Sequence, residues 1–186
     1  MTDPHGATTS ATTGATTGAM TGPITLVLGG TRSGKSSFAE QLIGRLGGPL
    51  VYIATGAAVD DEMGLRIAAH RERRGSAYKT VEAGAELARA LTEAPARPAL
   101  VDSLGTWVAA HEHLAPDVDE LVAALRSRAA PTVVVSDEVG LGVHPSTELG
   151  RRFRDVLGLV NQAVAAAADD VWLVVAGRGL RLETPT

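Results

Sequence analysis

Cysteine is absent from the sequence, which excludes disulfides, thiolate metal sites, iron–sulfur clusters and a cysteine nucleophile. Aromatic residues make up only 3%, and 17 basic residues against 21 acidic ones leave a net charge of -4. Because proteins bind nucleic acid through basic surfaces and aromatic stacking platforms, we expect no nucleic-acid partner. No apolar run approaches the roughly 18 residues that a membrane helix needs, so no membrane span is expected either.

The first 22 of the 186 residues have almost nothing to bury, because they are mostly Thr, Ala and Gly. We therefore expect residues 1–22 to be a disordered tail and residues 23–186 to form a single domain. The tail lacks the basic start and apolar middle of a secretory signal, and it lacks arginine, so we expect a cytoplasmic protein. Met20 lies just before the expected domain and is an alternative start.

Short apolar runs alternate with helical patterns along the rest of the chain. Strands are predicted over 24–28, 50–54, 78–83, 99–102, 131–136 and 171–176, and helices over 36–46, 60–74, 86–93, 117–128 and 148–168. The strands are apolar throughout rather than alternating, which is typical of a parallel sheet covered by helices on both faces. The predicted class is α/β, mostly parallel, and ligands of such sheets bind at the carboxyl ends of the strands.

A glycine-rich motif of the form G-x-x-x-x-G-K-S follows the first predicted strand and precedes the first predicted helix. It consists of Gly29, Gly30, Thr31, Arg32, Ser33, Gly34, Lys35 and Ser36. Glycines in such a loop let backbone N–H groups turn toward a phosphate, and the helix N-terminus adds to the attraction. A chance match to a glycine-rich turn is the alternative, but both flanks favour a P-loop that binds a nucleoside triphosphate.

Two of the candidate residues are expected to hold Mg²⁺. The Ser36 hydroxyl is the expected ligand from the P-loop, and Asp102, which ends an apolar strand, is the expected carboxylate. A turn or cap role is the alternative for Asp102. Glu138 follows another strand and is either a metal contact, a water contact, a base or a solvated loop carboxylate. Glu82, in the strand predicted over 78–83, is also counted among the expected nucleotide-binding residues.

The P-loop does not identify the acceptor of the phosphate. No N/T-K-x-D segment of the kind that switch GTPases use to read guanine is present. The run HRERR at 70–74 could serve as the arginine-rich lid of a small-metabolite kinase. The residues by themselves therefore predict a P-loop phosphotransferase and leave its substrate open.

Six segments in a fixed order between about Ile24 and Leu182 narrow the choice. They are GGTRSGKSSFAE at 29–40, YIAT at 52–55, DEM with RI and HR over 61–71, VDSL at 101–104, EVG at 138–140, and FRD, G and NQ over 153–162. Together they resemble the bifunctional adenosylcobinamide kinase/adenosylcobinamide-phosphate guanylyltransferase family of cobalamin biosynthesis. Departures from the family pattern are Asp137 for a usual Asn, Gly75 for Pro, Tyr78 for Trp, and Arg178 in a normally apolar turn.

The resemblance implies two reactions and a homotrimer. ATP or GTP would phosphorylate the terminal hydroxyl of the aminopropanol arm of adenosylcobinamide. GTP would then transfer GMP onto that phosphate, giving adenosylcobinamide-GDP and pyrophosphate. In the family this second step passes through a guanylylated histidine, and the matching position here is His70.

The chemistry of imidazole is compatible with that role for His70. A neutral imidazole is a competent nucleophile near pH 7 and can form a phosphoramidate with the α-phosphorus. Without the family, a histidine in the last turn of the helix over 60–74 would be the simpler interpretation. His111 and His113 are expected to be solvent-exposed, and His144 is either a substrate contact or a plain loop residue.

Two other functions remain open at this stage. One is a P-loop kinase that phosphorylates another small hydroxyl compound without a covalent histidine step. The other is a nucleotide-dependent switch or assembly protein without enzyme activity. No guanine-reading motif or partner surface supports the second.

Overall fold

The computed structural model describes residues 21–56 and 78–184. The helix predicted over 60–74, its His70 and the expected tail up to residue 20 lie outside the described residues. Gly22, at the end of that expected tail, donates its backbone N–H to the Arg128 carbonyl at 2.7 Å.

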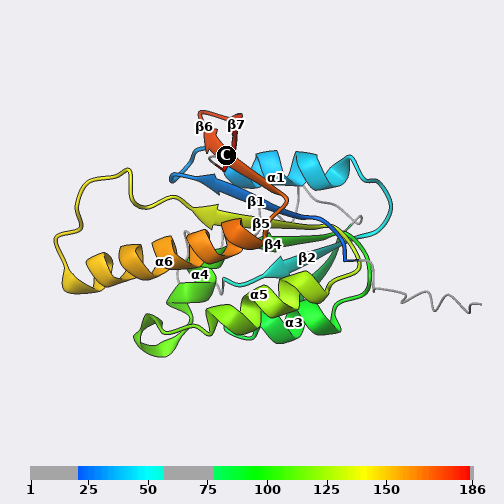
Figure 1. Ribbon diagram of the computed structural model, residues 1–186, viewed down its shortest axis with the longest axis horizontal. Coiled ribbons are helices and arrows are strands. Elements are labelled where there is room, and N and C mark those ends of the chain that lie inside the picture. Colours follow the sequence, from blue (N-terminus) through cyan, green and yellow to red (C-terminus); the bar gives the residue numbers. More distant parts are fainter. Residues whose placement is uncertain (1–20, 57–77, 185–186) are drawn as a thin grey trace, which may run out of the picture.

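A seven-stranded sheet in the order β3-β2-β4-β5-β1-β6-β7 forms the centre of the protein (Figure 1). The strands are β1 (Ile24–Gly29), β2 (Leu50–Ala54), β3 (Tyr78–Glu82), β4 (Ala99–Asp102), β5 (Thr132–Asp137), β6 (Asp170–Val175) and β7 (Arg178–Leu182). All neighbouring pairs are parallel except β6 and β7, which confirms the mostly parallel sheet.

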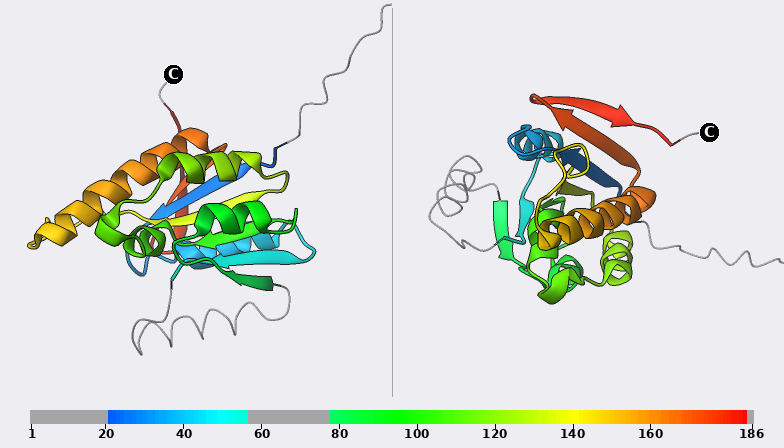
Figure 2. Two further views of the ribbon diagram at one scale, coloured as in Figure 1. Left: turned by 90° about the horizontal axis from the view of Figure 1, so that it is seen from below. Right: turned by 90° about the vertical axis from the view of Figure 1, so that its left-hand side faces the viewer.

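Helices cover both faces of the sheet, as predicted. They are α1 (Lys35–Gly44), α3 (Leu87–Glu93), α4 (Leu104–Ala109), α5 (Val118–Ser127) and α6 (Glu148–Ala167), with a short 3-10 helix η2 (Glu112–Leu114). Helix α1 packs on one face, where Ala39 and Ile43 meet Val27 and Val133. The helices α3, α4, α5 and α6 pack on the other face, and the views in Figures 1 and 2 show this separation.

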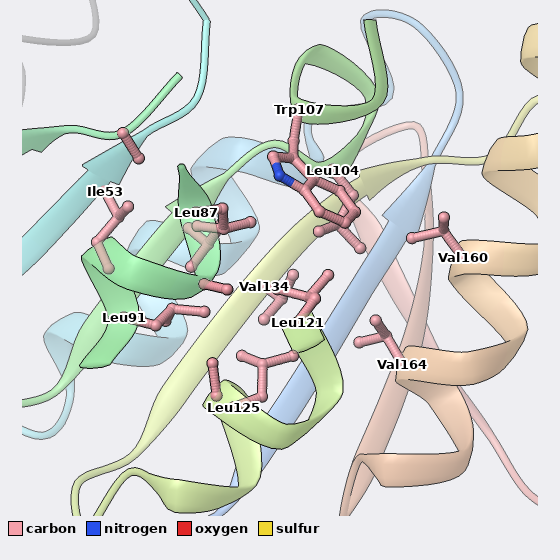
Figure 3. Packing of buried hydrophobic residues seen from close by; sticks show 14 of the residues in the cluster. Ile53, Leu87, Leu91, Leu104, Trp107, Leu121, Leu125, Val134, Val160 and Val164 are labelled. Atoms are coloured by element: carbon pink, nitrogen blue, oxygen red, sulfur yellow. The ribbon is translucent and has the colours of Figure 1, made fainter. Parts of the chain in front are cut away.

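The larger hydrophobic core lies between the sheet and these four helices (Figure 3). Trp107 of α4 is among its largest fully buried side chains, and its indole N–H donates to the Ala85 carbonyl at 3.0 Å. Leu121 of α5 and Val160 of α6 are completely buried around Val134 of β5. Burying side chains of this size stabilises the fold by about 1.5–3 kcal/mol each.

Three elements were not predicted from the sequence: helix α4, the short 3-10 helix η2 and strand β7. Helix α4 follows β4 at once, and Ser103 caps it by accepting from the Thr106 N–H while the Thr106 hydroxyl receives the Ser103 N–H. This reciprocal cap uses Thr where a capping box usually has Glu or Gln, so the usual signal is missing. Strand β7 returns antiparallel to β6 through Ala176 and Gly177, which both have positive φ, as a tight hairpin turn requires.

At the edge of the sheet opposite the strand carboxyl ends, Arg128 is buried and joins three chain segments. Its guanidinium donates to the carbonyls of Leu91 and Arg97 at 2.8 Å each and to the Thr132 hydroxyl at 3.0 Å. Burial lowers the pKa of Arg128 from its ordinary value. Among the described residues no helix combines the length and apolarity needed to cross a bilayer.

Candidate nucleotide site

The glycine-rich loop joins β1 to α1, so the predicted sequence of strand, loop and helix is confirmed. Gly29 must lack a side chain, because a Cβ there would lie 2.5 Å from Ser33 Oγ and 2.8 Å from the Val174 carbonyl oxygen. Gly34 has φ 91°, a left-handed conformation that glycine adopts without strain. The loop is closed by a hydrogen bond from the Ser33 N–H to the Gly30 carbonyl and braced by one from the Gly177 N–H to the Ser33 carbonyl.

Helix α1 begins at Lys35 with a terminus suited to an anion. Its cap residue, Gly34, has no side chain, and the first turn carries no acidic side chain. The Lys35 N–H donates to Ser33 Oγ at 3.3 Å. The first backbone N–H groups of a helix have no partner within the helix, and the helix dipole adds partial positive charge there. This end of α1 can therefore receive a phosphate, as the motif predicts.

Lys35 is the first residue of α1, and its side chain is mostly buried. Its Nζ is 2.6 Å from Asp137 Oδ1 and donates to the Gly30 carbonyl at 3.3 Å. Asp137 ends β5, whose register with β1 places it opposite Gly29. The structure thus brings together a predicted residue, Lys35, and one that was noted only as a departure from the family pattern.

Asp102 ends β4 and lies near the same edge of the sheet, but not beside β1. Strand β5 separates β4 from β1, so Asp102 is two strands away from the P-loop. Its Oδ2 accepts a hydrogen bond from the Tyr52 hydroxyl at 3.1 Å. The carboxylate is therefore oriented by a side chain of β2, and its residue ends β4 at the edge of the sheet where a ligand would bind.

A buried group of hydroxyls lies beside Asp102. Thr55 Oγ1 is 2.6 Å from the Ser103 carbonyl oxygen and 2.7 Å from Thr106 Oγ1, and it accepts from the Ser103 N–H at 2.8 Å. These bonds tie the end of β2 to the start of α4 and hold the backbone that follows Asp102. Sequence reasoning missed them, although Thr55 belongs to the quoted YIAT segment.

Glu82 is not brought close to the P-loop. It ends β3, the outermost strand, opposite Ala54 of β2. Strands β2, β4 and β5 lie between it and β1, a separation of about 19 Å at ordinary strand spacing. A role for Glu82 would thus involve a different part of a ligand from the one at Lys35.

The remaining candidates have simpler surroundings. The Glu138 carboxylate folds back on its own loop and accepts from the N–H groups of Gly140 and Leu141 at 2.9 Å each. His144 Nδ1 lies 2.8 Å from Arg154 Nη1 on α6. His113 is exposed, as predicted, but the prediction is wrong for His111, whose ring packs edge-on against Trp107 and whose Nε2 is buried. Helix α4, which was not predicted, supplies that indole.

The arrangement of a parallel sheet, a P-loop after β1 and carboxylates at the ends of neighbouring strands defines a P-loop nucleotide-binding protein. The fold is similar to that of the flagellar accessory protein FlaH from Methanocaldococcus jannaschii. The TM-score is 0.51 with 14% identity, covering 87% of this chain and 76% of that one.

The chain belongs to the cobinamide kinase/cobinamide phosphate guanyltransferase family, whose model matches residues 25–182. It is 40% identical over 179 residues to the bifunctional adenosylcobalamin biosynthesis protein CobU of Salmonella typhimurium, covering 85% of this chain and 98% of that protein. It is 41% identical over 166 residues to the bifunctional adenosylcobalamin biosynthesis protein CobP of Pseudomonas aeruginosa, covering 85% of this chain and 96% of that protein. The family resemblance stated from the sequence motifs is thereby confirmed.

Proposed function

We propose that this chain catalyses two successive transfers onto adenosylcobinamide. In the first, the hydroxyl oxygen of the aminopropanol arm attacks the γ-phosphorus of ATP or GTP, and the nucleoside diphosphate leaves. In the second, an oxygen of the new phosphate monoester receives GMP from GTP, and pyrophosphate leaves. The match to the family over nearly the whole described domain is the observation that carries this proposal.

The kinase step depends on positioning and charge, because phosphoryl transfer asks little covalent chemistry of the protein. Residues 29–36 would wrap the β- and γ-phosphates with backbone N–H groups, and the start of α1, which carries no acidic side chain in its first turn, would add its dipole. Lys35 would compensate the charge that builds up between the β- and γ-phosphates. Its ammonium already faces the loop, since one of its partners is the Gly30 carbonyl.

Two oxygen donors at this edge of the sheet suit Mg²⁺. Ser36 offers a hydroxyl in the first turn of α1, and Asp102 offers a carboxylate oriented by Tyr52. Mg²⁺ prefers such hard oxygen donors, keeps several waters, and is usually held by one or two carboxylates together with substrate phosphates. The described residues contain no cluster of three or more His, Cys, Asp or Glu side chains that could hold an ion alone. When bound, the ion would neutralise phosphate charge; Ser36 and Asp102 would hold it.

For the guanylyl transfer we propose His70 as the nucleophile. Its imidazole nitrogen would attack the α-phosphorus of GTP, forming an N–P bond as pyrophosphate leaves. The phosphate of adenosylcobinamide phosphate would then displace the imidazole and take the GMP. His70 lies outside the described residues, so this assignment is supported by the position of His70 in the family-like segment 61–71. Glu82 and Asp102 are proposed to contact the nucleotide.

The remaining proposals concern the setting of the reaction. Because ATP and GTP are cytoplasmic substrates, we propose that the protein acts in the cytoplasm. We propose a homotrimer because the family resemblance implies one. The acidic balance of the chain supports small-molecule substrates rather than nucleic acid as partners.

A pair of product assays tests the two reactions separately. Adenosylcobinamide incubated with γ-labelled ATP should gain the label, and the purified phosphate incubated with α-labelled GTP should become labelled adenosylcobinamide-GDP. Labelling in the first assay but not in the second would leave a kinase only. Labelling in neither would contradict the proposed function.

A further inference from the structure

The contact between Lys35 and Asp137 places a negative charge where the phosphates of a nucleotide are expected. Lys35 Nζ is 2.6 Å from Asp137 Oδ1, and the two side chains are only 12% and 31% exposed. Partial burial strengthens such a pair, because less water screens it. The lysine that should bind the β- and γ-phosphates is therefore already neutralised by a residue of the neighbouring strand.

The backbone of Asp137 is held in place from two sides. The next residue, Glu138, donates its N–H to the Gly29 carbonyl at 3.1 Å. From α6, Asn161 donates its side-chain N–H to the Asp137 carbonyl at 3.0 Å, and its Oδ1 is 2.6 Å from Ser136 Oγ. Because this backbone is held, the contact between the two residues can be broken only by rotation of the Asp137 or the Lys35 side chain.

Gly105 of α4 provides the space that the carboxylate occupies. A Cβ at position 105 would lie 2.6 Å from Asp137 Oδ2, while the next atoms, Asp137 Cγ at 3.6 Å and Leu157 Cδ2 at 3.7 Å, would be at ordinary contact distance. Since only the end of a side chain stands in the way, an alanine there would push the carboxylate aside without moving backbone. The chain thus offers one substitution that removes the charge and another that displaces it.

We infer that Asp137 makes this site select nucleotides whose phosphate charge is compensated by a divalent cation. A metal-free triphosphate must compete with Asp137 for Lys35 and then remain beside a carboxylate, and like charges at such short range repel. A cation between the β- and γ-phosphates reduces their charge and weakens that repulsion. The inference rests on the proposed nucleotide site and adds a residue that determines which form of the nucleotide binds.

The test measures binding rather than turnover. The wild-type chain and Asp137→Asn are each titrated with a fluorescent N-methylanthraniloyl GTP, once with excess Mg²⁺ and once with EDTA. The quantity compared is the dissociation constant in EDTA divided by the dissociation constant in Mg²⁺. We expect Asp137→Asn to bind the metal-free nucleotide about tenfold more tightly, while binding with Mg²⁺ changes less than about threefold. Tenfold corresponds to about 1.4 kcal/mol.

Two further variants make the result specific. Gly105→Ala should lower the same ratio by less than Asp137→Asn does, because it displaces the carboxylate but keeps its negative charge in the protein. Asp119→Asn, an exposed carboxylate in the first turn of α5, changes the net charge equally and should leave the ratio unchanged. An unchanged ratio in Asp137→Asn would overturn the inference while the nucleotide site stands. Absence of saturable binding to the wild type under both conditions would overturn the nucleotide site itself.

Discussion

Lys35 illustrates at the scale of a single residue how sequence and structure combine. The motif predicts its role, because the lysine of a P-loop reaches the β- and γ-phosphates. The structure adds its present partner, Asp137, which lies 102 positions along the chain from it. No local pattern predicts that contact, since it follows from the parallel register of β1 and β5.

Replacing this lysine should stop the kinase step. Lys35→Ala removes the ammonium that compensates phosphate charge, so we expect the rate of adenosylcobinamide phosphorylation to fall about a hundredfold or more. The chain's other lysine, Lys79, is exposed on β3, and Lys79→Ala serves as the matched control. Circular dichroism and the melting temperature show whether each variant folds. Near-normal turnover in folded Lys35→Ala would remove the proposed role of the P-loop.

At the scale of helices and strands, a prediction is accurate where the local sequence pattern of the element is clear. Strands β2 and β4 have the predicted bounds, because each is a short apolar run. Helix α4 was missed because it starts directly after β4, with Thr106 in place of the expected acidic capping partner. Strand β7 was missed because its residues are all exposed and show no apolar run. Long-range contacts such as Asn161 to Asp137 depend on how α6 packs, which local patterns do not specify.

The connection between α5 and β5 gives a prediction about stability. Arg128→Leu would leave the carbonyls of Leu91 and Arg97 without their donor in a buried place, and each lost partner costs about 1–3 kcal/mol. We expect the free energy of unfolding in urea to fall by about 2–4 kcal/mol. The free energy of unfolding of Arg128→Lys, which keeps one donor group, should lie between those of the wild type and Arg128→Leu.

The matched control for this measurement is Arg126→Leu, because Arg126 is exposed on α5 only two residues away. It should change the free energy of unfolding by less than about 0.5 kcal/mol. Equal stability of Arg128→Leu and wild type would show that the buried hydrogen bonds of Arg128 contribute nothing net. Because Arg128 lies at the opposite edge of the sheet from Lys35, nucleotide binding should survive at low temperature.

At the scale of the whole molecule, the sequence predicts a domain that begins near residue 23. Gly22 donates to the Arg128 carbonyl, and the Thr132 N–H donates to the Pro23 carbonyl, so the chain is tied to the sheet from this point on. Deleting residues 1–20 should therefore leave the melting temperature within about 2 °C of the full chain, since the segment has little apolar surface to bury. A larger decrease, measured by differential scanning calorimetry, would show that the segment packs on the domain.

Both activities belong to one chain, and the width of its parallel sheet explains how one domain can hold them. Glu82 and Asp137 end strands at the same edge of the sheet, yet β2, β4 and β5 make that edge wide. The P-loop is at β1, whereas the chain segment with His70 connects β2 to β3. The kinase and guanylyl steps can thus draw on different strands of one sheet edge.

The most direct test of this account is the fate of the α-label of GTP on the protein. The wild type should carry an acid-labile, base-stable label, as a phosphoramidate does. His70→Asn keeps a polar side chain of similar reach but offers no nucleophilic nitrogen, so it should carry no label and accumulate adenosylcobinamide phosphate. His113→Asn, at an exposed position, is the control and should label normally. A labelled His70→Asn protein, or a wild type that never carries label, would contradict the account.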